Sequence, residues 1–178
     1  MHRSLIKGLI PGLILGLTLA LPVFAETPAD LNDLQMAHVG YTADNIDIQY
    51  AHLALALSTN ATVRAFAATM VSDHTAVNEQ ALALLAKLGA KPEDNFLSQA
   101  LNTGAAEMVN KLAALRGADF DRAYAANELA YHIAVNDIVG KSFVPNIENA
   151  ELKDLYTQGL MIFEAHQAAA QAMVEAVK

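Results

Sequence analysis

The sequence predicts an all-α protein of four long helices and one shorter helix, and three observations support this. The chain of 178 residues is rich in Ala and Leu, with no Trp and few Gly or Pro, a composition that favours helices. Apolar residues recur with the 3.6-residue period of a helix in four long stretches. Groups of Ser, Asn, Asp, Gly and Pro separate these stretches, where helix caps and breaks are expected.

The first two long helices are predicted over residues 29–57 and 61–88, and the Ser-Thr-Asn group between them ends one and caps the other. The apolar positions of the second helix are Val63, Ala67, Met70, Val77, Ala81, Leu84 and Leu88. One apolar position is missing from the gap between Met70 and Val77, and its occupant is His74. A histidine therefore occupies a position that the helical pattern reserves for a core residue.

The second half of the chain is predicted to form a crossover and another pair of helices. Gly89, a Pro and an Asp cap precede a shorter helix that begins at 96 or 97 and ends near 115. The third long helix is expected over 119–144, capped by Asp119 and ended by Pro145, and the fourth runs from 149 or 150 to the C-terminus. Two long hairpins joined by a crossover are a standard route to a four-helix bundle.

The first 25 residues have the pattern of an export signal. Arg3 and Lys7 precede an apolar run over 8–24. Val23 and Ala25 are small residues at the two positions that signal peptidase recognises, so we expect cleavage after Ala25. The run is short for a membrane span, so cleavage is favoured over retention as an anchor. We therefore expect residues 26–178 to form a single periplasmic domain without a transmembrane helix.

Charge and composition limit what this exported domain can bind. Loss of Arg3 and Lys7 changes the formal net charge from −8 to −10, which argues against nucleic acid and anionic lipid as partners. The absence of Cys excludes disulfides and thiolate metal sites. An envelope protein remains the open class of partner, and the sequence does not determine the oligomeric state.

Four polar residues lie on the predicted core faces of the four long helices: Asp47, His74, His132 and His166. With a rise of about 1.5 Å per residue, all four fall near the middle of the bundle, although the heights of His132 and His166 differ by more than one turn. Three imidazoles and one carboxylate suit a single zinc, copper, iron or manganese ion.

Two further carboxylates are candidates for this site. Glu128 precedes His132 by one turn and is either a ligand or a carboxylate that orients one. Asp73 points to the edge of the core beside His74, where it is expected to orient His132 or His166. If His74 replaces an apolar core residue, the substitution His74→Leu should abolish metal binding and preserve or raise the melting temperature of the metal-free protein.

The sequence also restricts the chemistry. A dinuclear carboxylate iron site requires Glu three residues before its histidines. The residues three positions before the candidate histidines are instead Val71, Leu129 and Phe163. No nucleophile and base can be paired, so a catalytic role is disfavoured. The alternative to a metal site is a metal-free helical adaptor or structural protein of the envelope, with the histidines in a polar core network. His38 and His52 are expected on a solvated face.

Three segments resemble a known family. They are "DIQYAHLALALSTNATVRAFAATMVSDHTAVNEQ", "GADFDRAYAANELAYHIAVNDI" and "ELKDLYTQGLMIFEAHQAAA", which together span most of the chain after residue 46. They are similar to the bacterial exported family called domain of unknown function 4142, which is placed among ferritin-like bundles. The resemblance implies a ferritin-like four-helix bundle with an additional short crossover helix between the second and third long helices.

The family pattern also implies which residues form its site. It has an acid in the first helix, a "VRxFAxxMVxDH" motif, a "FDxxY" motif followed by a histidine, and a histidine in the last helix. These correspond to Asp47, to the segment 63–74 that ends in His74, to the segment 120–124 followed by His132, and to His166. The family usually has Glu where this chain has Asp47, which is shorter by one methylene.

Overall fold

A computed structural model describes residues 26–178, in which helices are joined by short loops and no strand occurs. The main helices are α1 (Asp33–Leu57), α2 (Ala61–Lys87), α3 (Phe96–Ala113), α4 (Gly117–Ile138) and α6 (Ala150–Ala176). The expected export signal, residues 1–25, lies outside the described residues. The prediction of an all-α protein is confirmed.

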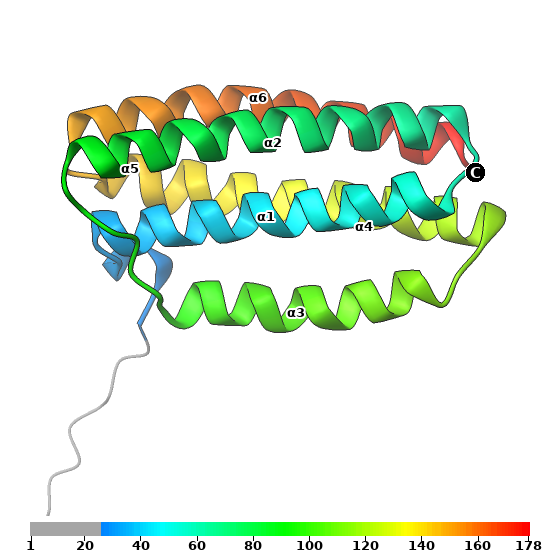
Figure 1. The fold of residues 1–178 in the computed structure, drawn as a ribbon, viewed down its shortest axis with the longest axis horizontal. Coiled ribbons are helices and arrows are strands. Elements are labelled where there is room, and N and C mark those ends of the chain that lie inside the picture. The colour runs from blue at the N-terminus through cyan, green and yellow to red at the C-terminus, as the bar shows by residue number, and fades with distance from the viewer. Residues whose placement is uncertain (1–25) are drawn as a thin grey trace, which may run out of the picture.

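Four long helices lie side by side, and α3 lies beside them (Figure 1). The two hairpins are α1 with α2 and α4 with α6, and they join through contacts of α2 with α6 and of α1 with α4. Helix α3 packs mainly against the outer side of α1, as Figure 1 shows. It is the predicted crossover helix between the second and third long helices.

The helix starts follow from local hydrogen bonds, and three of them differ from the predictions. The first helix was expected from 29, but a 3₁₀ turn covers Pro28–Asp30 and Asn32 caps α1 through reciprocal hydrogen bonds with Gln35, both 2.9 Å long. Asn95 caps α3, where an Asp was expected. Helix α4 begins at Gly117, whose φ of +57° favours glycine, and Asp119 lies in its first turn without capping it.

The prediction that the third long helix ends at 144 was also wrong. After α4 the chain forms a π-helical turn, Val139–Phe143, and then one helical turn, α5 (Val144–Asn146). Pro145 is tolerated because it lies in the first turn of α5, where a missing N–H has little consequence. The helical path therefore reaches Asn146, and this extension changes the relative heights of residues in α4 and α6.

The interior has two apolar clusters with a polar layer between them. One cluster contains Tyr50, Phe66 and Tyr124, and the other contains Met36 and Phe143 at the opposite end of the bundle. The polar layer consists of buried carboxylates and imidazoles: Asp44, Asp47, His74, Glu128, His132 and His166. The apolar ends hold the helices together, so the fold fixes the polar side chains in the middle.

The contact of Tyr156 of α6 with the main chain of α1 depends on one glycine. The hydroxyl of Tyr156 donates a hydrogen bond of 2.5 Å to the main-chain oxygen of Met36, and a side chain at Gly40 would collide with it. None of the helices in the described part of the chain is long and apolar enough to cross a membrane.

Candidate metal centre

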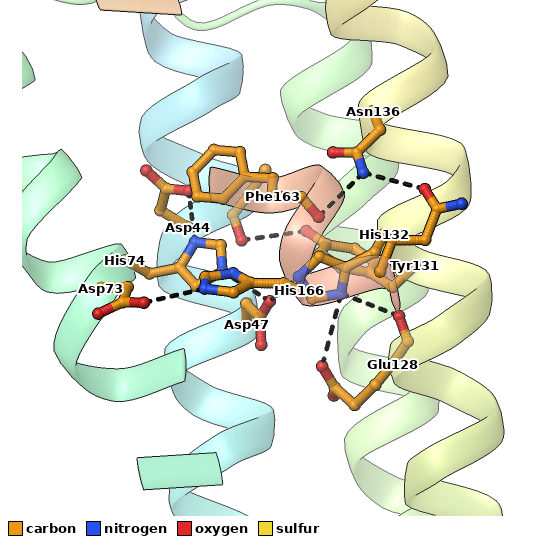
Figure 2. Close-up of polar contacts among 12 residues, drawn as sticks. Asp44, Asp47, Asp73, His74, Glu128, Tyr131, His132, Asn136, Phe163 and His166 are labelled. Carbon is orange, nitrogen blue, oxygen red and sulfur yellow. Dashed lines mark hydrogen bonds and ion pairs between the residues drawn. The ribbon is translucent and has the colours of Figure 1, made fainter. Parts of the chain in front are cut away.

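One side chain from each long helix reaches the middle of the bundle: Asp47 from α1, His74 from α2, His132 from α4 and His166 from α6 (Figure 2). We call these four residues the histidine centre. All are buried, with exposed fractions between 0% for Asp47 and 5% for His166. His132 and His166 were predicted to differ in height by more than one turn, but their ring centroids are only 5.6 Å apart, and the helical path after α4 extends to Asn146.

The three imidazoles form a nearly regular triangle. Their ring centroids are 5.4 Å apart for His74 and His166, 5.6 Å for His132 and His166, and 5.9 Å for His74 and His132. One nitrogen from each ring lies within 4.8 Å of the other two. Imidazoles bound at about 2.0–2.1 Å around one ion have centroids about 5.2–5.5 Å apart. The triangle therefore has nearly the size that one shared ion requires.

Each ring has one nitrogen fixed by an acceptor on the outer side of the centre. Nδ1 of His74 lies 2.7 Å from Oδ1 of Asp44, and Nδ1 of His132 donates to the main-chain oxygen of Glu128 at 2.9 Å. Nε2 of His166 lies 2.9 Å from Oδ2 of Asp73, which is one of the two roles expected for Asp73. Such hydrogen bonds set the tautomer and orientation of metal-binding histidines.

The other nitrogen of each ring is available for a ligand. Nε2 of His74, Nε2 of His132 and Nδ1 of His166 are buried and have no hydrogen-bond partner among residues 26–178. Because the outer nitrogens carry the protons of their hydrogen bonds, each neutral ring has its lone pair on the inner nitrogen. A buried polar atom without a partner costs about 1–3 kcal/mol, so this arrangement needs an explanation.

The carboxylate of Asp47 faces two of these nitrogens. Its Oδ2 lies 3.0 Å from Nε2 of His74 and 3.3 Å from Nε2 of His132. Although these atoms are close, neither pair has the geometry of a hydrogen bond. Ligand atoms that share one ion are about 3.0–3.4 Å apart. Both distances thus have the size expected between two ligands of one ion.

Glu128 is the second carboxylate of the polar layer. It is fully buried, its Oε2 lies 3.9 Å from Nδ1 of His132, and neither carboxylate oxygen has a hydrogen-bond partner in the described chain. It forms a second group of potential ligands with Asp47 and His132. Because its main-chain oxygen holds the ring of His132, Glu128 positions that ring whether or not its side chain binds an ion.

Asp44 was missed by the sequence reasoning, although it is buried and contacts His74. It precedes Asp47 by three residues, so the two carboxylates share one face of α1 and enclose the imidazole of His74 between them (Figure 2). The signal in the sequence that could have identified Asp44 is the spacing of two acids on a helix with few other charges. His52 is exposed, and His38 lies 3.6 Å from Asp94, so both are outside the histidine centre.

Burial and neighbouring charges determine the protonation of the centre when no metal is bound. Burial lowers the pKa of His74, but the hydrogen bond and charge of Asp44 and the charge of Asp47 outweigh it and raise the pKa to about 10. Burial also raises the pKa of Asp47, yet His74 and His132 hold it below the usual range. Burial and the charge of Asp47 raise the pKa of Glu128 well above that of a free glutamate. At neutral pH the metal-free centre therefore has a protonated His74, and burial favours the neutral form of Glu128.

The other two histidines are neutral at the same pH. Burial lowers the pKa of His132 despite the charge of Asp47. Burial also lowers the pKa of His166, although its hydrogen bond with Asp73 acts in the opposite direction. Neutral imidazole is the form that binds metal ions. Two of the three rings are therefore ready to bind an ion, and the third must first release a proton.

The space beside the rings is small. A cavity of about 10 Å³ is lined by Asp47, His74, His132 and neighbouring side chains, and the ring of Phe163 stacks on His74 with a centroid distance of 4.6 Å. A water molecule needs about 10–15 Å³ measured in this way, so there is room for one small ion or one water. The cavity has no room for an organic cofactor.

Comparison with known proteins identifies a family. A family model described as a domain of unknown function, DUF4142, matches residues 19–173. No curated protein and no solved structure matches the chain. The matched range contains α1 to α5, most of α6 and all four residues of the histidine centre. The chain therefore belongs to the DUF4142 family.

Proposed function

We propose that this protein binds one transition-metal ion through His74, His132, His166 and Asp47. The observation that carries the proposal is the difference between the two nitrogens of each imidazole ring. The outer nitrogen is held by a hydrogen bond, while the inner nitrogen is buried without a protein partner in the described chain. One nitrogen of each ring lies within 4.8 Å of a nitrogen of each of the other two. A metal ion would satisfy all three inner nitrogens at once.

The donor set indicates the class of ion. Three imidazole nitrogens and one carboxylate oxygen suit zinc, copper, iron or manganese, and the lack of thiolates removes the ligands that favour soft ions. Glu128 is close enough to Asp47 and His132 to complete a larger coordination number. Asp44 and Asp73 would then hold two of the rings from outside, as carboxylates do in many metal sites.

The proposed setting is the cell envelope. The first 25 residues have the pattern of a cleaved export signal, which would place residues 26–178 in the periplasm as a single domain. We propose that the domain is a ferritin-like bundle, because two helical hairpins joined by a crossover supply inward-pointing ligands in such folds. Metal handling or protection against oxidative stress is the role that this location and donor set suggest.

The rival function is a metal-free helical adaptor, and one observation favours it. Asp44, His74 and Asp47 already form an ion-paired network when His74 is protonated, and such a network can serve packing alone. The unpartnered nitrogens of His132 and His166 are not explained by that network. They distinguish the two functions and define the experiment.

The test uses tag-free protein produced with its own signal and purified from the periplasm. Elemental analysis and titration with zinc, cobalt, copper, iron and manganese should show one ion per chain, and the bound ion should raise the melting temperature. His132→Ala should lose the ion. The matched control is His52→Ala, which removes an exposed histidine of α1 and should bind as the parent does. Failure of every ion to bind or to shift the melting temperature would favour the adaptor.

A further inference from the structure

A second, larger pocket lies next to the histidine centre and has no part in holding an ion. Its volume is about 40 Å³, and side chains of α1, α2, α4, α6 and the π-helical turn line it. It exists because small residues occur where helices of a bundle usually present large ones. These are Ala37, Gly40 and Ala43 of α1, Ala81 of α2 and Gly159 of α6.

The lining of this pocket is almost entirely apolar. Of the polar groups that reach it, Asp44 is bonded to His74, and the hydroxyl of Tyr156 is bonded to a main-chain oxygen of α1. Tyr41 is the remaining one and is half-buried. Apolar cavities of this kind exclude water and accept small apolar molecules such as xenon. The volume is a few times that needed for one water, which limits the occupant to a few atoms.

The pocket adjoins the metal centre directly. Four residues line both this pocket and the small cavity at the histidine rings: Ala43, Asp44, Val135 and Phe163. The ring of Phe163 stacks on His74 with an interplanar angle of 7°, so its thickness is what separates the pocket from that imidazole. Figure 2 shows Phe163 beside His74 on the same side as Asp44. An occupant would therefore lie beside the ion that the centre is proposed to bind.

The outer end of the pocket approaches an acidic surface. Leu155 lines the pocket and also a hollow between α2 and α6 that includes Glu151 and Asp154. These carboxylates, together with the net negative charge of the chain, oppose the approach of anions. A neutral molecule meets no such barrier. Size, apolar lining and charge thus select the same class of ligand.

We propose that this pocket binds a neutral diatomic molecule of the dioxygen class and holds it beside the histidine centre. The contact with bound metal rests on the proposed function, whereas binding in the pocket follows from its apolar lining and size. The structure thereby suggests which small molecule the metal would meet, and it favours uncharged oxidants over anionic ones.

Xenon tests the pocket without any metal. Crystals of the metal-free protein under xenon pressure should show one xenon atom between Ala81 and Gly159. Ala81→Leu fills this space and should abolish the xenon peak, while Ala83→Leu places the same side chain on the exposed face of α2 and should leave it unchanged. Gly159→Ala is a milder second variant, since its methyl group would make ordinary contact with Phe163, and it should lower the occupancy.

Dissolved dioxygen tests the occupant itself. Because dioxygen is paramagnetic, it should shorten the relaxation times of the Val135 methyl groups, which line both cavities, and Ala81→Leu should remove this effect. Absence of both xenon and oxygen effects in the parent protein would overturn the inference. Both experiments use metal-free protein, so a failure to bind metal would overturn the proposed function separately, through the titrations described above.

Discussion

Replacing His74 with Leu should destabilise the metal-free protein. The substitution leaves the buried carboxylates of Asp44 and Asp47, which are 5% and 0% exposed, without the cation between them. Removing one partner of a buried ion pair costs about 3–5 kcal/mol, and the added apolar burial returns about 1 kcal/mol. The expected loss is therefore about 2–4 kcal/mol in the free energy of unfolding.

Thermal unfolding in the presence of a chelator measures this loss. A change of about 1 kcal/mol shifts the melting temperature by roughly 2–4 °C in a chain of this size, so a decrease of roughly 4–16 °C is expected. The double variant His74→Leu with Asp44→Leu removes one of the unpaired charges and should recover part of the loss. A His74→Leu variant that melts at or above the temperature of the parent would refute the reasoning.

The pH dependence supplies an independent check with a definite sign. The pKa of His74 is about 10 in the folded protein and near 6.5 without neighbours. A raised pKa stabilises the folded state fully below about pH 6.5, and this contribution is lost as the pH rises through about 10. The parent protein should lose stability over this interval. In the variant this loss is absent, so the difference in stability between the two proteins should narrow as the pH rises.

Four further predictions concern proton release, Asp73 and two glycines. Because His74 is protonated in the metal-free centre, ion binding should release about one proton. Below pH 10 the apparent Kd should therefore decrease about tenfold for each unit by which the pH is raised, which competition with a zinc indicator at several pH values can measure. Asp73→Asn should weaken metal affinity about 10–100-fold without abolishing it, because Asp73 orients His166; unchanged affinity by calorimetry would contradict this role. Gly159→Ala should raise stability by about 1 kcal/mol, since it adds helix propensity and fills part of a cavity. Gly40→Ala should lower stability by about 1–2 kcal/mol, because its methyl group displaces a buried tyrosine hydroxyl, and urea unfolding of the two variants compares them directly.

The positions of the helices could be predicted because their causes are local. The periodicity of apolar residues depends only on neighbours in the chain. So does the cap at Asn60, which accepts hydrogen bonds of 2.9 and 3.3 Å from the N–H groups of Thr62 and Val63. The same periodicity placed His74, His132 and His166 on core faces. The ends of α4 were predicted less well: the helix begins at Gly117, which has a positive φ, and a π-helical turn continues the helical path beyond its end.

The sequence by itself determined an all-helical chain with buried polar residues on four helices, because helix period and capping are properties of short segments. Only the tertiary structure decided that Asp44 shares His74 with Asp47 and that Asp73 holds His166. It also reverses the expectation for His74→Leu: viewed along one helix the histidine replaces an apolar residue, but in space it is the cation between two buried carboxylates. These relations depend on how helices distant in sequence are rotated and aligned against each other, which local periodicity does not specify.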